Sequence, residues 1–265
     1  PDSSIALLKQ YGQQRELEQP VATLDFPSYL AIMTYAQDRA LREELYKAYT
    51  TRASEQSEHT EFDNSEIMQE ILSLRQEMAQ LLGFENYAAY SLASKMAPNV
   101  ATVFEFLNEL AEHARTPALQ EITELKAIAA QDGIDELQPW DSSFYSEKLK
   151  QQQFNLSQEA LKPYFPAPKV VQGLFEIVHR LYGIQIQERA APVWQSDVRY
   201  FEIEDQGQVL GGFYLDLYAR HGKRGGAWMS GFRSRMQTVH GLQKPICYMV
   251  CNFTPPVGNQ PALLT

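Results

Sequence analysis

Hydrophobic residues recur every three or four positions through roughly the first two thirds of the chain, which is the spacing of one face of an α-helix. The clearest case covers residues 63–83. Asp63 and Glu66 have the spacing of a capping box, and Gly83 stands where a helix commonly ends. The residues of this segment that we expect to face inward are Ile67, Ile71, Leu74, Met78 and Leu81.

The same periodicity predicts further helices. One long helix should begin near Asn99, and Pro117 should kink or break it, because proline removes a helical hydrogen bond. Another covers residues 170–183 and ends at Gly183, and shorter helices are expected at 27–36 and 40–55. The inward residues of the two longer helices are Val103, Phe106, Leu107 and Leu110 in the first, and Val171, Leu174, Phe175, Val178 and Leu181 in the second.

After Gly183 the pattern changes to apolar residues at every second position, which is typical of a half-buried strand. Segments rich in aromatic and β-branched residues indicate strands at 184–188, 198–205, 209–222 and 244–253. The short connections imply antiparallel neighbours in a small meander or mixed sheet. We therefore predict a mainly α fold, with a helical body at 1–183 and a small sheet region at 184–265.

Net charge and composition limit the classes of partner that the protein can bind and the compartment in which it is expected. The net charge is −10, and no run of Lys or Arg is longer than a pair, which excludes the basic surface typical of nucleic-acid or anionic-membrane binding. No apolar run is long enough to span a bilayer. The chain has 2 cysteines, and such low use fits a reducing compartment, so we expect a cytoplasmic protein.

The sequence contains no recognisable catalytic or metal motif. None of its 5 histidines stands in an H-E-x-x-H pattern, and no G-x-S-x-G elbow occurs. Cys247 and Cys251 have the wrong spacing for a redox or zinc motif and are interpreted as small buried side chains. Glu202 and Glu204 alternate with apolar residues, as on a solvated sheet face. We therefore assign no catalytic residue and no metal ligand.

Gly225, Gly226 and Ala227 form the most unusual local segment. They follow the expected strand at 209–222, and we interpret them as part of a second short strand. Glycine weakens a strand unless another backbone must come close, so these residues form a candidate edge at which an extended peptide adds as a strand. The alternative from the residues alone is a plain β-bulge.

Five stretches, in the same order along essentially the whole chain, resemble the thimet-oligopeptidase family of zinc metallopeptidases. They lie at 24–54, 81–97, 137–154, 211–228 and 242–253. The resemblance implies a mostly helical fold with a deep channel that admits short unfolded peptides, a small sheet beside the zinc, and a monomeric protein. It also implies that the strand matching Gly225, Gly226 and Ala227 borders the channel and pairs with the substrate backbone.

In that family an H-E-x-x-H helix and a later Glu hold the zinc, and none of these groups is found in this sequence. The connector at 255–265 resembles the lead into that helix. We therefore expect an internal fragment of a zinc-dependent oligopeptidase that binds no zinc and cleaves nothing by itself. The alternative is a non-catalytic peptide-binding or scaffold protein that lost the metal-binding half. A fragment would leave apolar surface uncovered and is expected to self-associate.

Overall fold

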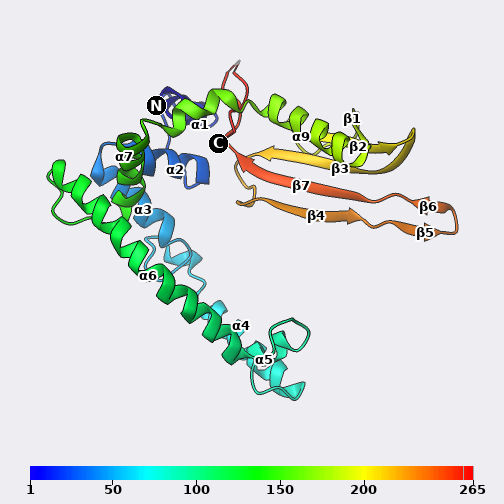
Figure 1. Ribbon diagram of the computed structural model, residues 1–265, viewed down its shortest axis with the longest axis horizontal. Helices are drawn as coiled ribbons and strands as arrows, with labels where there is room; N and C mark the ends of the chain where they lie inside the picture. Colours follow the sequence, from blue (N-terminus) through cyan, green and yellow to red (C-terminus); the bar gives the residue numbers. More distant parts are fainter. Residues whose placement is uncertain (259, 265) are drawn as a thin grey trace. The chain divides into compact units, whose positions relative to one another are not determined.

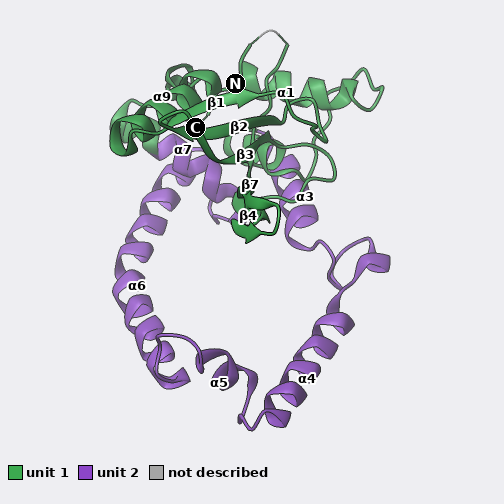
Figure 2. Cartoon of the chain, turned by 90° about the vertical axis from the view of Figure 1, so that its right-hand side faces the viewer, with its two compact units in different colours: residues 1–36, 150–265 green, residues 37–149 purple. Residues whose placement is uncertain are grey.

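The structure is a computed structural model that describes residues 1–258 and 260–264, so Asn259 and Thr265 of the predicted connector lie outside the described residues. The described chain divides into two compact units (Figure 2). Unit 1 consists of Pro1–Ala36 and Lys150–Thr265, and unit 2 is the intervening segment Gln37–Leu149. The change from helix to strand after Gly183 lies inside unit 1, so the predicted division into 1–183 and 184–265 does not coincide with these units.

Unit 1 contains a mixed sheet, which the described residues build from five strands in the order β1-β2-β3-β7-β4 (Figure 1). Strand β7 runs parallel to β3, and the other neighbours are antiparallel. A short hairpin, β5–β6, follows β4 along the chain. The bounds are β1 Gln185–Arg189, β2 Arg199–Asp205, β3 Gln208–Tyr218, β4 Trp228–Arg233, β5 Met236–Thr238, β6 Gly241–Gln243 and β7 Ile246–Phe253.

Helix α9 (Ala167–Tyr182) covers one face of this sheet. Its Val171 packs into a buried cluster with Phe201, Phe213 and Leu215, whose side chains share that face because neighbouring strand residues alternate between faces. Gly183 ends the helix with φ +74°, a left-handed conformation that glycine adopts without a steric penalty. The sequence prediction of this helix and its end is confirmed.

The remaining elements of unit 1 are helical. Helices α1 and α2 pack together, and Leu7, Tyr11, Ile32 and Met33 are buried there. The bounds are α1 Asp2–Gln13, α2 Phe26–Tyr35, α8 Gln158–Leu161 and η3 Lys162–Tyr164. Helix α7 (Ser142–Phe154) begins in the sequence of unit 2 and ends in that of unit 1.

Unit 2 is helical throughout its described elements. Its core joins Ile128 and Ala129 of α6 to Tyr145 of α7. A buried carboxylate, Asp141, accepts hydrogen bonds from Arg39 and Arg42 and so links α3 to the start of α7. The bounds are α3 Arg39–Thr50, η1 Thr60–Phe62, α4 Ser65–Leu81, α5 Tyr87–Leu92, α6 Val100–Gln131 and η2 Pro139–Asp141.

Three local predictions for the helices need correction. The expected capping box does not form, because Asp63 accepts hydrogen bonds from the backbone and hydroxyl of Ser65. Pro117 does not break α6, which runs continuously from Val100 to Gln131. Most of the residues expected to face inward on α4 and α6, together with Leu174 and Leu181 of α9, are exposed. Asn99 and Gly83 do lie at the start of α6 and the end of α4, as predicted.

The predicted fold class, a helical body with a small mixed sheet near the C-terminal end, is confirmed. Within residues 1–258 and 260–264, no helix combines the length and the apolar character that a membrane crossing requires.

Candidate functional site

Strand β4 lies at one edge of the sheet. It pairs antiparallel with β7, and in the described chain no other strand pairs with it. Every second residue of an edge strand points its backbone N–H and C=O away from its neighbour. The chain therefore presents a row of backbone donors and acceptors along β4 that an added strand could use.

Gly225, Gly226 and Ala227 precede this edge strand directly. The strand begins at Trp228, so the expectation that it passes through the two glycines is wrong. Gly226 has φ +95°, which is outside the extended region and interrupts the strand. No atom of the described chain lies within 4 Å of a Cβ built on Gly225 or Gly226, so internal packing does not require either glycine. All three residues are exposed at the start of β4.

Asn252 of β7 holds this glycine-containing loop. Its side-chain nitrogen Nδ2 donates to the carbonyl oxygen of Arg224 at 2.9 Å and to that of Gly226 at 2.7 Å. The strand register explains why the Asn252 side chain can contact these carbonyls. Strand β7 lies beside β4, and Asn252 is two residues beyond Val250, the partner of Trp228. One amide therefore fixes the backbone on both sides of Gly225.

A buried ion cluster fixes the other end of the loop. Asp216 near the end of β3 is 4% exposed, and both its carboxylate oxygens accept from Arg220, at 2.7 and 2.9 Å. Lys223 Nζ donates to the carboxylate at 2.8 Å and to the carbonyl of Tyr218 at 2.7 Å. Trp194 adds an indole hydrogen bond to Asp216 at 3.2 Å. The loop thus leaves β3 with its charges paired and its backbone anchored.

The electrostatics of this cluster follow from burial and pairing. Burial alone would raise the pKa of Asp216, but the hydrogen bonds from Arg220 and Lys223 outweigh it and hold that pKa below the usual range. Burial lowers the pKa of Lys223, while Asp216 opposes that shift. Removing one partner would leave a buried charge unpaired, so each group needs the other.

The sequence did not identify Asp216, Arg220, Lys223 or Asn252 as functional. The available signal was an acidic residue within the apolar strand segment FYLDLYA, because a buried carboxylate needs a cationic partner nearby. Two basic residues follow within seven positions. Asn252 can bond the loop only because β7 lies beside β4 in the sheet. The spacing of residues in the sequence does not reveal this strand order.

Neither cysteine is placed to act as a nucleophile. Cys247 and Cys251 are half-buried and free, and burial raises the pKa of both thiols. A raised pKa keeps a thiol protonated, which disfavours nucleophilic attack. His59 and His113 are exposed beside glutamates, and the ring of His179 lies 3.0 Å from the carbonyl oxygen of Ile184 at the end of α9.

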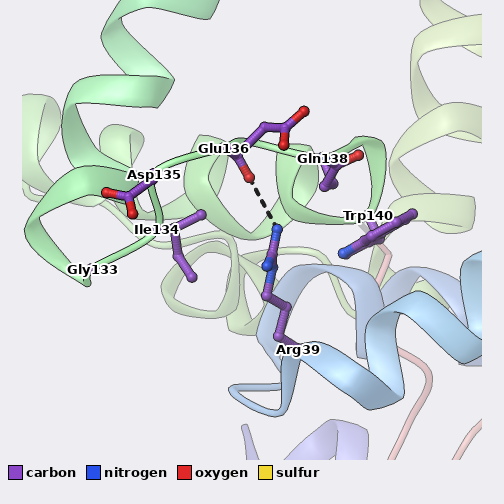
Figure 3. A pocket seen from close by; sticks show the side chains of 7 residues that line it. All are labelled: Arg39, Gly133, Ile134, Asp135, Glu136, Gln138 and Trp140. Carbon is purple, nitrogen blue, oxygen red and sulfur yellow. Dashed lines mark hydrogen bonds between the residues drawn. The ribbon is translucent and has the colours of Figure 1, made fainter.

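Unit 2 has a pocket of its own, lined by residues 133–136 and by Arg39, Gln138 and Trp140 (Figure 3). The guanidinium of Arg39 is held by the carbonyl of Glu136 at 3.0 Å and by the carboxylate of Asp141. The lining contains no histidine, cysteine or hydroxyl side chain. This pocket therefore offers no hydroxyl, thiol or imidazole nucleophile, and the open edge at β4 is the stronger candidate site.

Among the described residues, no group of three or more His, Cys, Asp or Glu side chains gathers in a way that could hold a metal ion. The carboxylate of Asp216 is occupied by cations. Glu202 and Glu204, which the sequence placed on a solvated sheet face, are only partly exposed and pair with Arg189. The residues in this part of the chain do not fit a zinc ion.

Comparisons with known proteins agree on one family. The family model described as Peptidase family M3 matches residues 32–265. The chain is 53% identical over 270 aligned residues to oligopeptidase A of Escherichia coli strain K12, and the match covers 100% of this chain and 40% of that protein. Dipeptidyl carboxypeptidase of the same organism is 38% identical over 86% of this chain and 33% of its own length. The chain thus spans about 40% of the length of the oligopeptidase A that it resembles.

Proposed function

Because the chain belongs to peptidase family M3, we propose that it forms part of a peptidase that hydrolyses short peptides. The observation that carries this proposal is the 53% identity to a protein named oligopeptidase A, maintained over the whole chain. The name dipeptidyl carboxypeptidase in a second relative also describes action on peptides. In this proposal the complete protein is a monomeric zinc metallopeptidase of the cytoplasm, and zinc would supply a Lewis acid and an activated water.

The described residues have a separate task in this proposal, which is to bind the peptide backbone. Gly225, Gly226 and Ala227 lead the substrate onto the open edge of β4, where the peptide adds as an extended strand. The support is geometric: the edge is open, the loop is exposed, and Asn252 and the Asp216 cluster hold the loop in place. A fixed edge binds a peptide at a lower entropic cost than a mobile loop would.

The zinc and the hydrolytic step are not assigned to any described residue. Since no cluster of ligands is found among them, we expect the 265-residue chain alone to hold no stoichiometric zinc and to leave peptides intact. The measurements are metal analysis after dialysis and a quenched fluorescent peptide assay. One tightly bound zinc per chain together with peptide cleavage would contradict this part of the proposal.

The backbone-binding task is tested by peptide binding to the same chain. A fluorescein-labelled extended peptide should bind, and a copy with alternate backbone nitrogens methylated should not, because methylation removes the N–H donors that a sheet edge accepts. Side chains are the same in both peptides, so equal binding would overturn strand addition. Fluorescence anisotropy gives both affinities.

The compartment of the complete protein is proposed from its composition and from the name of one relative. One relative from Arabidopsis thaliana is named probable cytosolic oligopeptidase A, and another from the same plant is named organellar. The cytoplasm is therefore proposed from the low use of cysteine and from the first of these names. A tagged full-length protein followed by cell fractionation would test it.

A further inference from the structure

The sheet face opposite α9 carries a row of aromatic rings. Tyr200 of β2, Tyr214 of β3 and Tyr248 of β7 are register neighbours, and Phe232 of β4 extends the row to the edge strand. We call these four residues the ring row. Successive ring centroids lie 4.9, 5.7 and 5.4 Å apart, within the usual range for interacting aromatic pairs.

The alternation of strand residues places the ring row on the face that α9 does not cover. Phe213 and Cys247 belong to the cluster under α9, and each is followed directly by a ring-row tyrosine on the other face. Trp194 lies against Tyr214 and Tyr248, with centroids 5.2 and 5.4 Å away. Trp194 is itself 49% exposed, so this face remains partly open to solvent.

The row reaches the open edge at a small residue. Across the sheet, Tyr200, Tyr214 and Tyr248 are followed in register by Ser230 of β4. Beside Ser230, Phe232 leans toward Tyr248 and is 60% exposed. A strand added to β4 would place the residue opposite Ser230 with its Cβ about 5 Å away, on the same face as these rings.

From this arrangement we propose that the ring row forms a side-chain subsite for an aromatic residue of the bound peptide. The inference rests on the proposed function, because it requires a peptide strand beside β4. The aromatic side chain opposite Ser230 would contact Phe232 and continue the row by one ring. The complex would thus select an extended peptide with an aromatic residue at one position on this face.

The opposite face of β4 provides a matched control. Met229 is 71% exposed and lies on the same strand, but it is opposite Met249, two residues beyond Cys247 and therefore on the α9 face. Met229 and Phe232 are both large, exposed apolar residues of the edge strand. They differ in the face of the sheet on which they lie.

The test compares two labelled peptides that differ at one central position, Phe or Ala, in an otherwise threonine-rich extended sequence. We expect the chain to bind the Phe peptide about three- to tenfold more tightly, as aromatic pairs do beyond their buried area. Phe232→Ala should reduce this affinity ratio to about one, because it removes a cross-strand side-chain contact. Phe232→Tyr should retain the ratio, and Met229→Ala should leave it unchanged. Circular dichroism of each variant checks that the fold is retained.

The possible outcomes distinguish failure of the aromatic subsite from failure of peptide binding at the edge of β4. If both peptides bind equally to the original chain and the methylated peptide does not bind, the edge is used and the subsite is overturned. If Met229→Ala abolishes the preference as Phe232→Ala does, the selection does not come from the ring row. If no peptide binds, the proposed docking edge fails together with the subsite.

Discussion

At the scale of single residues, Gly225 and Gly226 are neighbours in one exposed loop, but their backbone requirements differ. Gly226 has φ +95°, which non-glycine residues rarely adopt, whereas Gly225 is not among the glycines with positive φ. We expect Gly226→Ala to lower the free energy of unfolding by about 1–2 kcal/mol and Gly225→Ala to change it by less than about 0.5 kcal/mol. Urea unfolding of both variants measures this.

Because a Cβ at either position meets no neighbouring atom of the described chain within 4 Å, steric clash does not complicate the comparison. The two substitutions are therefore matched in chemistry and exposure. Equal losses in both variants would show that the loop does not hold Gly226 in the conformation described.

The buried carboxylate of Asp216 predicts a dependence of stability on pH. Its folded-state pKa is depressed, so the native chain binds fewer protons than the unfolded chain. The stabilisation is therefore present above about pH 4, the usual pKa of an aspartate, and is lost as the pH falls through the lower folded-state value. We expect Asp216→Asn to be less stable at neutral pH and to have a flatter stability curve below about pH 4.

Denaturant unfolding at several pH values tests this expectation. The control is Glu121→Gln, which removes an exposed carboxylate of α6 and should change the curve little. Asp141 of unit 2 also has a depressed pKa, because hydrogen bonds from Arg39 and Arg42 outweigh its burial, so some acid sensitivity will remain in the variant. Parallel curves for Asp216→Asn and the original chain would contradict the role given to Asp216.

Residue patterns indicated an unusual backbone at Gly225 and Gly226 but not the contacts that hold this loop. The glycines indicated an unusual backbone, and the structure locates it at the start of an edge strand. Asn252 donates to two carbonyl groups of the loop and Lys223 to the carbonyl of Tyr218 at the end of β3, and every residue type possesses such a carbonyl. Side-chain to backbone contacts of this kind leave no periodic signal in a sequence, so they required the structure.

At the scale of elements, α6 continues through Pro117 where the sequence predicted a kink or break. Proline lacks the N–H that would bond the carbonyl four residues earlier, and its ring crowds that turn. We expect Pro117→Ala to stabilise the helix by about 1–3 kcal/mol, because it restores one helical hydrogen bond at an exposed position. Hydrogen exchange of the α6 amides around residue 117, whose new N–H donates to the carbonyl four residues earlier, and thermal unfolding measure the gain.

The neighbouring Thr116→Ala is the control for this experiment. It also places alanine at an exposed position of α6, but it changes helix propensity by only a few tenths of a kcal/mol. A loss of stability in Pro117→Ala would mean that the proline is favourable in its surroundings and that the helix is shaped around it.

Periodicity predicted most elements because helices and strands repeat about every 3.6 and 2 residues, and it failed where a local contact decided the outcome. The strands β1, β2, β3 and β7 and the helices α2, α4, α6 and α9 were expected at nearly these positions. Strand β4 was displaced by the left-handed Gly226, and the capping box was replaced by the bond of Asp63 to Ser65. The pattern also could not show that β7 inserts between β3 and β4, since that depends on contacts distant in sequence.

At the scale of the whole chain, the units join segments that are remote in sequence. Unit 1 combines Pro1–Ala36 with Lys150–Thr265, so its N-terminal helices belong with the sheet and not with the next helices along the chain. A change of sequence pattern along the chain marks a single boundary. It cannot show that two segments remote in sequence belong to one unit. Long-range packing, such as that of α2 with β7, supplies the missing information.

The helix faces of α4 and α6 that the sequence predicted as buried are mostly exposed in the described chain. On α4, the exposed apolar residues include Ile67, Leu74 and Leu81, and the last is 80% exposed. An amphipathic helix gains most of its stability by burying such a face, and contiguous exposed apolar area favours association. We therefore expect the 265-residue chain to bind a hydrophobic dye and to self-associate as its concentration rises.

Replacing these three residues of α4 with Gln should reduce both dye binding and association, while the melting temperature stays nearly unchanged, because exposed side chains contribute little to the core. The control replaces Gln69 and Ser73, two exposed polar residues of the same helix, with other polar residues. It should alter neither dye binding nor association. Sedimentation velocity and dye fluorescence provide the two measurements. If the original chain is monomeric and binds no dye, these helix faces are covered within the chain. A large fall in the melting temperature of the triple variant would also mean that they are covered.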